Sequence, residues 1–331
     1  MRAMVLHAPA PAEGRPLRAE EVVEPLPGPG EVTLRVRACG VCRTDLHIVE
    51  GDLPQARFPL IPGHQVVGQV VGLGPGVDPS MLHATVGLGW MGGTCGECRF
   101  CREGRENLCS EAEFTGFTRP GGYAERAVAK ASFCYRLPSH LNAERAAPLL
   151  CAGIIGYRAL RLAGALEPVR VGFFGFGASA HVAIQVARFF SAQVFVFTRA
   201  DQHQRHAREL GASWAGNPTD PPPAPLDCAV IFSPAGEQVP LALQHVIPGG
   251  TVACAGITMS QIPSLPYALL YPERRLISVA NATRQDAREL LDLAARIPIH
   301  TQVEVLPLAE ANEALLRVKR SQVQGALVLQ P

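Results

Sequence analysis

The chain has 331 residues, of which 47% are hydrophobic, and a formal net charge of +1. This length allows two domains with separate cores, and the near-zero charge argues against a nucleic-acid partner. The longest apolar stretch, residues 169–190, is interrupted by three glycines, His181, Gln185 and Arg188, so we expect no membrane span. The first residues lack the apolar core of a signal peptide, so we expect a cytoplasmic protein. Ten cysteines in such a protein are more often ligands or core thiols than disulfides.

The first part of the chain predicts short strands separated by glycine and proline turns. In residues 31–38, Val32, Leu34 and Val36 alternate with polar side chains, as in a half-buried strand. Further strands are predicted at residues 64–71, 85–90 and 122–129. Many short strands punctuated by turns indicate a barrel-like β domain.

Residues 39–47 directly follow the first of these strands. They are predicted to form one short loop that carries four chemically reactive side chains. Cys42, Thr44, Asp45 and His47 supply a thiol, a hydroxyl, a carboxylate and an imidazole. A soft ligand with proton-carrying groups behind it suits a metal that must both bind and react. The alternative is a buried cysteine pair, Cys39 and Cys42, in a polar turn.

Four cysteines form the most specific pattern in the chain, with the spacing C-x2-C-x2-C-x7-C: Cys95, Cys98, Cys101 and Cys109. Four thiolates can close a tetrahedron around zinc, which leaves no open position and predicts a structural ion. An iron–sulfur cluster can also take four cysteines. Four unrelated thiols are the third alternative.

Three isolated residues, Cys42, His64 and Cys151, are candidate ligands of a second metal. Two thiolates and a neutral imidazole would cancel the charge of zinc and leave one position open for water or substrate. Each residue is weak evidence by itself, because His64 could begin an ordinary strand and Cys151 could be a core thiol. Their convergence does not follow from their spacing.

The pattern changes near Asn142, a predicted helix N-cap, and becomes an alternation of strands and helices. The predicted strands are 169–174, 193–197, 226–232 and 251–255, and the predicted helices are 178–190, 201–210 and 237–246. This alternation is typical of a parallel sheet covered by helices.

Residues 175–180 read Gly-Phe-Gly-Ala-Ser-Ala between a predicted strand and a predicted helix, the GxGxxA form of a dinucleotide-binding turn. Gly175 makes the turn, and Gly177 lets the backbone of Gly177 and Ala178 approach a pyrophosphate. The small Ala180 allows close packing of the helix, whose N-terminus favours phosphate.

The second strand of this unit, residues 193–197, is followed by Thr198-Arg199 and carries no carboxylate at its tip; Asp201 follows two residues later. An acidic residue there would bind the adenosine ribose of NAD(H). A small neutral residue followed by an arginine suits a 2′-phosphate, so we favour NADP(H) and keep NAD(H) as the alternative.

The C-terminal part begins with Thr283-Arg284-Gln285-Asp286, a capping box that predicts a helix to about residue 296. A strand, a helix and a last strand at residues 326–329 follow. We expect residues 1–151 and 285–331 to form the first domain and residues 152–284 the second.

The motifs at residues 40–47, Pro62-Gly63-His64, the four-cysteine lobe and Cys151-Ala152-Gly153 resemble the zinc-dependent alcohol dehydrogenases in order and spacing. These enzymes belong to the medium-chain dehydrogenase/reductase family, and the resemblance extends over nearly the whole chain. It implies an α/β fold with a GroES-like β-barrel catalytic domain and a Rossmann doubly wound parallel-sheet cofactor domain. It also implies reversible hydride transfer between a primary alcohol and NAD(P)+, two zinc ions per chain, and a homodimer or homotetramer.

The resemblance assigns roles to individual residues. Cys42, His64 and Cys151 would hold the catalytic zinc, while Thr44 and His47 would relay the proton of the alcohol. Asp45 and Gln65 would stand directly behind the ligands, and Trp90 would line the substrate pocket.

The sequence departs from the family pattern at three positions. Gln65 replaces a glutamate after the zinc histidine, Ile155 replaces a threonine near the nicotinamide, and Ala326 replaces an arginine that contacts the pyrophosphate. These changes remove no ligand but put the rate and the usual substrate in doubt. A polyol dehydrogenase of the same superfamily, and a non-catalytic zinc- and nucleotide-binding protein, therefore remain as alternatives.

Overall fold

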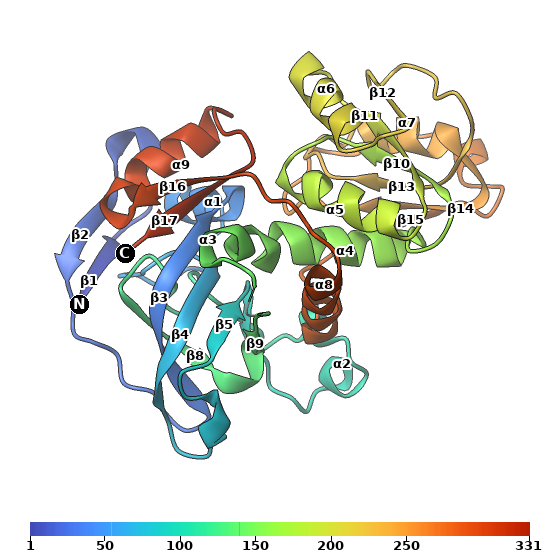
Figure 1. The fold of residues 1–331 in the computed structure, drawn as a ribbon. Coiled ribbons are helices and arrows are strands. Elements are labelled where there is room, and N and C mark those ends of the chain that lie inside the picture. Colours follow the sequence, from blue (N-terminus) through green and yellow to red (C-terminus); the bar gives the residue numbers. More distant parts are fainter. Residues whose placement is uncertain (54, 139) are drawn as a thin grey trace. The chain divides into compact units, whose positions relative to one another are not determined.

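The computed structural model describes residues 1–53, 55–138 and 140–331, and the chain forms two compact units (Figure 1). The first unit comprises Met1–Cys151, Thr283–Arg296 and His300–Pro331. The second comprises Ala152–Ala282 and Ile297–Ile299.

No single helix in the described ranges is long and apolar enough to cross a membrane. One bent pair, Ala143–Leu150 with Ala152–Ala163, meets the criteria of length and composition only when its two halves are combined.

The core of the first unit is built on a seven-stranded sheet. Its strands are β3 (Glu31–Val41), β4 (Gln65–Leu73), β5 (Thr85–Leu88), β8 (Arg126–Lys130), β9 (Cys134–Arg136), β16 (Val303–Pro307) and β17 (Ala326–Gln330). Their order is β16-β17-β3-β4-β5-β9, and β8 also pairs with β3. β17 runs antiparallel to β3, so the C-terminal tail rejoins the first unit, as the red and blue arrows in Figure 1 show.

Smaller elements surround this sheet. Two further sheets pair β1 (Arg2–Leu6) with β2 (Leu17–Glu21) and β6 (Met91–Gly93) with β7 (Glu113–Phe114). The helices are α1 (Arg43–Glu50), α2 (Arg99–Arg102), α3 (Ala143–Ala146), α8 (Arg284–Arg296) and α9 (Ala311–Lys319). The 3-10 turns are η1 (Ala12–Gly14), η2 (Pro79–Met81), η3 (Glu106–Leu108), η4 (Ala131–Phe133), η5 (Ala147–Leu150) and η7 (Leu308–Glu310).

The predicted loop at residues 39–47 was wrong. β3 continues to Val41, and α1 begins two residues later at Arg43. Cys42 is the N-cap of α1: its Sγ accepts a hydrogen bond from the N–H of Thr44 at 3.3 Å. The Asp45 carboxylate accepts the N–H of Cys42 at 2.9 Å and completes a capping box.

The second unit is a six-stranded sheet in which every pairing is parallel. Its strands, in spatial order, are β12 (Trp214–Gly216), β11 (Gln193–Phe197), β10 (Arg170–Phe174), β13 (Leu226–Ile231), β14 (Val246–Cys254) and β15 (Arg275–Ser278). Counted from β10, this is the order 3-2-1-4-5-6 of the dinucleotide-binding fold. The predicted doubly wound parallel sheet is therefore confirmed.

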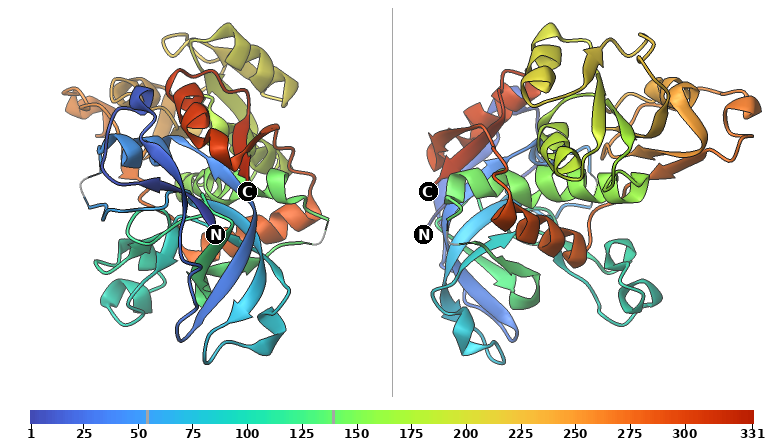
Figure 2. Two further views of the ribbon diagram at one scale, coloured as in Figure 1. Left: turned by 90° about the vertical axis from the view of Figure 1, so that its left-hand side faces the viewer. Right: turned by 45° about the vertical axis from the view of Figure 1, so that its right-hand side comes forward.

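Helices cover both faces of this sheet. They are α4 (Ala152–Ala163), α5 (Ala178–Phe189), α6 (Asp201–Glu209) and α7 (Gln238–His245), with the 3-10 turn η6 (Tyr267–Leu269). In the right-hand view of Figure 2, α5 and α7 lie on opposite sides of the sheet. α4 packs directly on α5, where a Cβ on Gly156 would lie 2.9 Å from the carbonyl oxygen of Ser179. Only glycine allows this close approach.

Both predicted helix caps are confirmed. The Asn142 side chain accepts the N–H groups of Glu144 and Arg145. At the start of α8, the N–H of Asp286 donates to Thr283 Oγ1 at 3.2 Å, and the N–H of Thr283 donates to Asp286 at 2.8 Å. The short strands β12 and β15 were not predicted.

Candidate metal centres and cofactor turn

The structure brings Cys42, His64 and Cys151 together within the first unit. One ligand atom from each lies within 4.8 Å of the other two, and Cys42 Sγ is 3.3 Å from His64 Nε2. The pairing of β3 with β4 explains part of this, because Gly40 lies opposite Gln65 in the register. Cys42 therefore leaves β3 beside the point where His64 enters β4. Cys151 follows η5, which packs against both strands.

Behind His64 stands the carboxylate of Asp45, and both side chains are completely buried. Asp45 Oδ1 lies 2.9 Å from His64 Nδ1, so His64 directs Nε2 towards Cys42. Burial raises the pKa of the Asp45 carboxyl. Burial alone would lower the pKa of His64, but Asp45 and Cys42 together raise it well above its usual range.

The thiols of Cys42 and Cys151 differ in their pKa. The hydrogen bond with Cys151 holds the pKa of Cys42 well below its ordinary value, and the same contact raises that of Cys151. Cys42 is therefore the more acidic of the two thiols. A divalent ion with a preference for sulfur and nitrogen would displace the remaining protons and satisfy all three ligands. The donor set thus fits a zinc ion with an open fourth position.

The other two side chains of the predicted relay, Thr44 and His47, lie on α1. Thr44 is in the first turn next to Cys42. His47 lies in the last turn, where Nδ1 is 2.7 Å from Asp52 Oδ2. Nε2 of His47 is buried and has no hydrogen-bond partner among the described residues.

The C-cap of α1 creates the contact between His47 and Asp52. Gly51 adopts a left-handed conformation with φ +83° and ends the helix. The N–H of the next residue, Asp52, then donates to the carbonyl of His47 at 2.9 Å. The cap thereby returns the Asp52 carboxylate to the imidazole five positions earlier. Asp52 was missed in the sequence, although His-x3-Gly-Asp at a helix end is a readable signal.

Trp90 and Gln65 also lie at this centre. The Trp90 ring meets His64 edge-on, with ring centroids 5.2 Å apart, and stacks on Phe114 and Phe117. Gln65 is buried, and a Cβ on its cross-strand neighbour Gly40 would lie 2.8 Å from the Gln65 amide oxygen. The Gln65 side chain therefore packs over the backbone of β3.

Cys95, Cys98, Cys101 and Cys109 form a second group, with all four sulfur atoms within 4.8 Å of one another. The sulfur of Cys95 lies 3.8 Å from that of Cys101 and 3.5 Å from that of Cys109. A tetrahedral zinc site with Zn–S bonds of about 2.3 Å separates its sulfurs by ~3.8 Å. A cluster of several irons needs a wider cage, so these distances favour a single ion over the iron–sulfur alternative.

The predicted cofactor turn joins β10 to α5. Gly175 has φ +92°, and a Cβ there would lie 3.0 Å from Ser233. Gly177 is exposed, a Cβ added to it would meet no atom within 4 Å, and it gives α5 no side-chain cap. The first N–H groups of this helix therefore face open space and can bind an anion. Ala178 begins α5, and Ala180 is fully buried.

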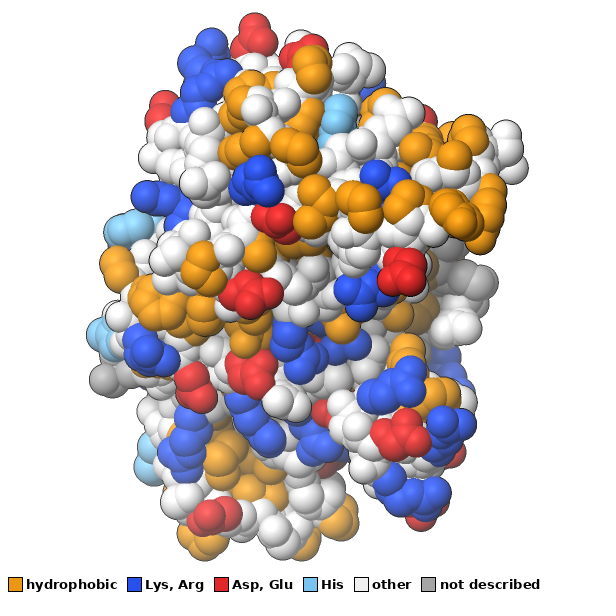
Figure 3. Space-filling view, turned by 90° about the vertical axis from the view of Figure 1, so that its right-hand side faces the viewer, with side chains coloured by type: hydrophobic (Ala, Val, Ile, Leu, Met, Phe, Trp, Pro, Cys, Tyr) orange, Lys and Arg blue, Asp and Glu red, His pale blue; other side chains and the backbone are white. Residues whose placement is uncertain are grey.

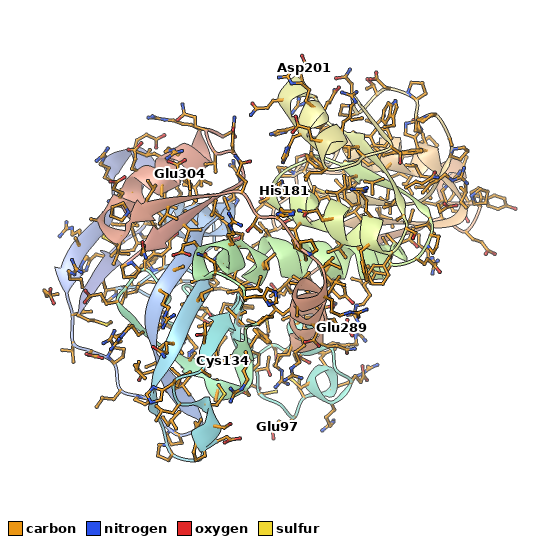
Figure 4. The ribbon with its side chains drawn as sticks, in the orientation of Figure 1. Glu97, Cys134, His181, Asp201, Glu289 and Glu304 are labelled. Carbon is orange, nitrogen blue, oxygen red and sulfur yellow. The ribbon has the colours of Figure 1, made fainter. Side chains whose placement is uncertain are left out.

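The tip of β11 carries Thr198 and Arg199. Thr198 is buried and its N–H donates to the carbonyl of Gly216, whereas Arg199 is exposed. Asp201 begins α6, and Figure 4 shows it at the outer end of that helix. The first charged side chain after the end of β11 is therefore the cation of Arg199.

A pair of histidines beside the cofactor turn was also missed. His181 Nδ1 on α5 lies 2.8 Å from His206 Nε2 on α6. Figure 4 labels His181 near the start of α5. The His206 ring also contacts Phe176, which stands between the two glycines of the turn. The pair joins the two helices whose N-termini flank the turn, and no spacing rule predicts such a contact between helices.

Two family models match the chain: the alcohol dehydrogenase GroES-like domain over residues 28–139 and the zinc-binding dehydrogenase domain over residues 180–296. A protein of Mycobacterium tuberculosis (strain CDC 1551 / Oshkosh) named "Probable alcohol dehydrogenase AdhA" is 42% identical over 335 residues, which cover 99% of this chain and 97% of that protein. This chain belongs to the zinc-type medium-chain alcohol dehydrogenase family.

Other members of the family are similar over the same length. An alcohol dehydrogenase of Geobacillus stearothermophilus is 34% identical over 95% of this chain and 96% of its own length. The solved structure of a cinnamyl alcohol dehydrogenase from Sorghum bicolor has a TM-score of 0.90 and 28% identity, covering 99% of this chain and 97% of its own. The chain is therefore an alcohol dehydrogenase or reductase that uses a nicotinamide cofactor and acts on small alcohols or aldehydes. This disfavours the non-catalytic alternative.

The thiols of the four-cysteine lobe should differ in reactivity once the metal is removed. Backbone N–H groups, that of Cys98 first, lower the pKa of Cys95 to about 7, while burial raises that of Cys101 to about 11. Because the thiolate is the nucleophile, iodoacetamide at pH 7.5 should alkylate Cys95 well before Cys101 in metal-free, reduced protein. Peptide mass spectrometry over time measures this order. Equal rates at the two sites would contradict it, and metal-loaded protein, in which both should be protected, is the control.

Proposed function

We propose that this chain is a zinc-dependent alcohol dehydrogenase that interconverts a primary aliphatic or aromatic alcohol and its aldehyde, with NADP(H) preferred over NAD(H). The observation that carries the proposal is the convergence of Cys42, His64 and Cys151, with Thr44 and Trp90 beside them. Two thiolates and one imidazole leave a fourth position for the substrate oxygen.

Each group at this centre has a separate task. A zinc ion held by the three ligands would act as a Lewis acid on the substrate oxygen, and the nicotinamide would exchange the hydride. Asp45 holds His64 with Nε2 directed at the metal position. The aromatic wall of Trp90, Phe114 and Phe117 supplies apolar surface that suits the carbon chain or ring of an alcohol.

A proton must leave the substrate hydroxyl during oxidation and return during reduction. Thr44, next to Cys42, would accept it and pass it to His47, which lies further along α1. With Nδ1 of His47 2.7 Å from Asp52 Oδ2, the carboxylate would accept the Nδ1–H and leave Nε2 as the proton acceptor. This nitrogen is buried and has no hydrogen-bond partner among the described residues. It is therefore free to accept a hydrogen bond from a hydroxyl group of a bound substrate or cofactor.

The cofactor site rests on the second unit. The exposed first turn of α5 offers its N–H groups to the pyrophosphate, and Gly175, Gly177 and Ala180 keep that approach open. The exposed Arg199 beside neutral Thr198 would pair with a 2′-phosphate. The second zinc ion would be structural, held by the four-cysteine lobe.

The edge of the second sheet supports a proposal for the quaternary structure. β15 ends the strand order, and Tyr267 and Tyr271, which precede it, are each 73% exposed. Figure 3 shows hydrophobic side chains gathered among charged ones on one face of the molecule. Because an exposed edge strand with apolar neighbours favours pairing with a second copy, we propose a homodimer or homotetramer, located in the cytoplasm.

Changing Cys42→Ser or Cys151→Ser should lower turnover of butanol or benzyl alcohol to below about 1% of wild type, because a ligand is lost. Binding of NADPH, followed by its fluorescence, should remain, since the cofactor turn is untouched. Cys134→Ser changes a thiol outside both metal groups and should keep full activity. Full activity of Cys42→Ser would refute the open zinc site.

Changing Arg199→Asp should move the cofactor preference towards NAD(H). The substitution replaces a cation that pairs with a 2′-phosphate by an anion that accepts from the ribose hydroxyls, so kcat/KM with NADP+ should fall about 10–100-fold relative to NAD+. Initial rates with both cofactors measure the ratio. Arg102→Asp, an equal charge change on the exposed helix α2, is the control. An unchanged ratio would show that Arg199 does not contact the phosphate.

A further inference from the structure

Tyr123 is a fully buried side chain whose hydroxyl has no hydrogen-bond partner among the described residues. A buried polar group without a partner is costly and rare in folded proteins. Phenylalanine would fill the same space without that cost. The hydroxyl therefore requires an explanation from its surroundings.

The Tyr123 ring packs against the segment that presents His64. A Cβ on Gly63 would lie 2.4 Å and 2.7 Å from two carbons of the ring, so no larger residue fits beside it. The N–H of Tyr123 donates to the carbonyl of Pro62 at 3.0 Å, and that of Gly122 donates to the carbonyl of Gly63 at 2.8 Å. These contacts fix the ring under Pro62-Gly63 and explain the glycine of the Pro-Gly-His motif.

The Tyr123 ring lies against Gly63, directly before His64, and His64 is hydrogen-bonded to Asp45, so the Asp45 carboxylate is near enough to act on the Tyr123 hydroxyl. Burial first, and then the Asp45 charge, raise the pKa of Tyr123 well above its usual range, so the hydroxyl keeps its proton. Asp45 already accepts from the N–H of Cys42 and from His64 Nδ1, each at 2.9 Å. A carboxylate has capacity for about four donors, so one more can be accommodated.

The charge of Asp45 matters most when a metal is bound. A ligand histidine must then donate its Nδ1–H and receive the support of an anion. A completely buried anion needs every available donor, because no water compensates its charge. The Tyr123 hydroxyl is a neutral donor in the right place.

We propose that, in the zinc-loaded protein, the Tyr123 hydroxyl donates a hydrogen bond to Asp45 and so positions the Asp45–His64 pair. Tyr123 is a positioning residue, since it touches neither the metal position nor the substrate. The inference rests on the proposed zinc site at Cys42, His64 and Cys151.

The test is the release of zinc from purified, zinc-loaded protein to a colorimetric chelator. Two phases are expected, and Cys42→Ser identifies the phase of the open site because it removes that phase. Tyr123→Phe deletes only the hydroxyl and should weaken zinc binding at this site about tenfold, at the lower end of the effect of outer hydrogen-bond partners. The phase of the four-cysteine lobe should not change.

Tyr135→Phe is the matched control, because it deletes the hydroxyl of another buried tyrosine in the same unit. It should leave the release from the open site unchanged. A purely structural role for Tyr123 predicts that both phases stay as in wild type while only the thermal midpoint shifts, and this result would overturn the inference. If no phase depends on Cys42, the proposed zinc site itself is wrong.

A second measurement uses the wild-type protein and does not depend on the folding of a variant. The hydroxyl proton of Tyr123 should exchange slowly enough to be observed by NMR in the zinc-loaded protein, coupled to the ring of Tyr123, and be lost after chelation. Failure to protect this proton when zinc is bound would contradict the proposed hydrogen bond.

Discussion

One capping box determines the geometry of the centre. Cys42 is the N-cap of α1 and a proposed metal ligand, and its sulfur accepts the N–H of Thr44. Asp45, three residues later, closes the box with one carboxylate oxygen and holds His64 with the other. The local hydrogen bonds that begin a helix therefore also aim two ligands at one point. Because Asp45 and His64 are completely buried, loss of either partner would leave an uncompensated polar group, which is strongly destabilising.

The sequence predicted the second unit better than the first. Its strands and helices are long, periodic and separated by glycines, so β11 occupies the predicted residues 193–197 and α6 begins at the predicted Asp201. The first unit depends on pairings between distant segments, such as β17 with β3, that no local pattern encodes. The loop predicted at residues 39–47 was wrong because cysteine is not among the preferred N-caps and its capping role depends on Asp45.

The sequence was sufficient to select the candidate ligand residues, but it could not show that Cys42, His64 and Cys151 meet in space. Four closely spaced cysteines can meet within one lobe, so their local spacing was sufficient evidence. Cys42, His64 and Cys151 are far apart in the chain, and their convergence depends on the β3–β4 register and on the packing of η5. Sequence alone could not identify the contact partners of three further features: Tyr123, Asp52 and the His181–His206 pair.

The balance of charge explains how the centre can tolerate Gln65. Two thiolates would cancel the charge of a divalent ion, so the buried Asp45 carboxylate adds one negative charge that its donors must stabilise. A glutamate at position 65 would bring a second carboxylate close to β3, where the amide of Gln65 packs over Gly40. A neutral amide adds no second negative charge and leaves the metal position more electropositive. The buried Asp45 carboxylate accepts hydrogen bonds from the N–H of Cys42 and from the His64 ring. We therefore expect the geometry of the Asp45–His64 pair to control how firmly a metal is held.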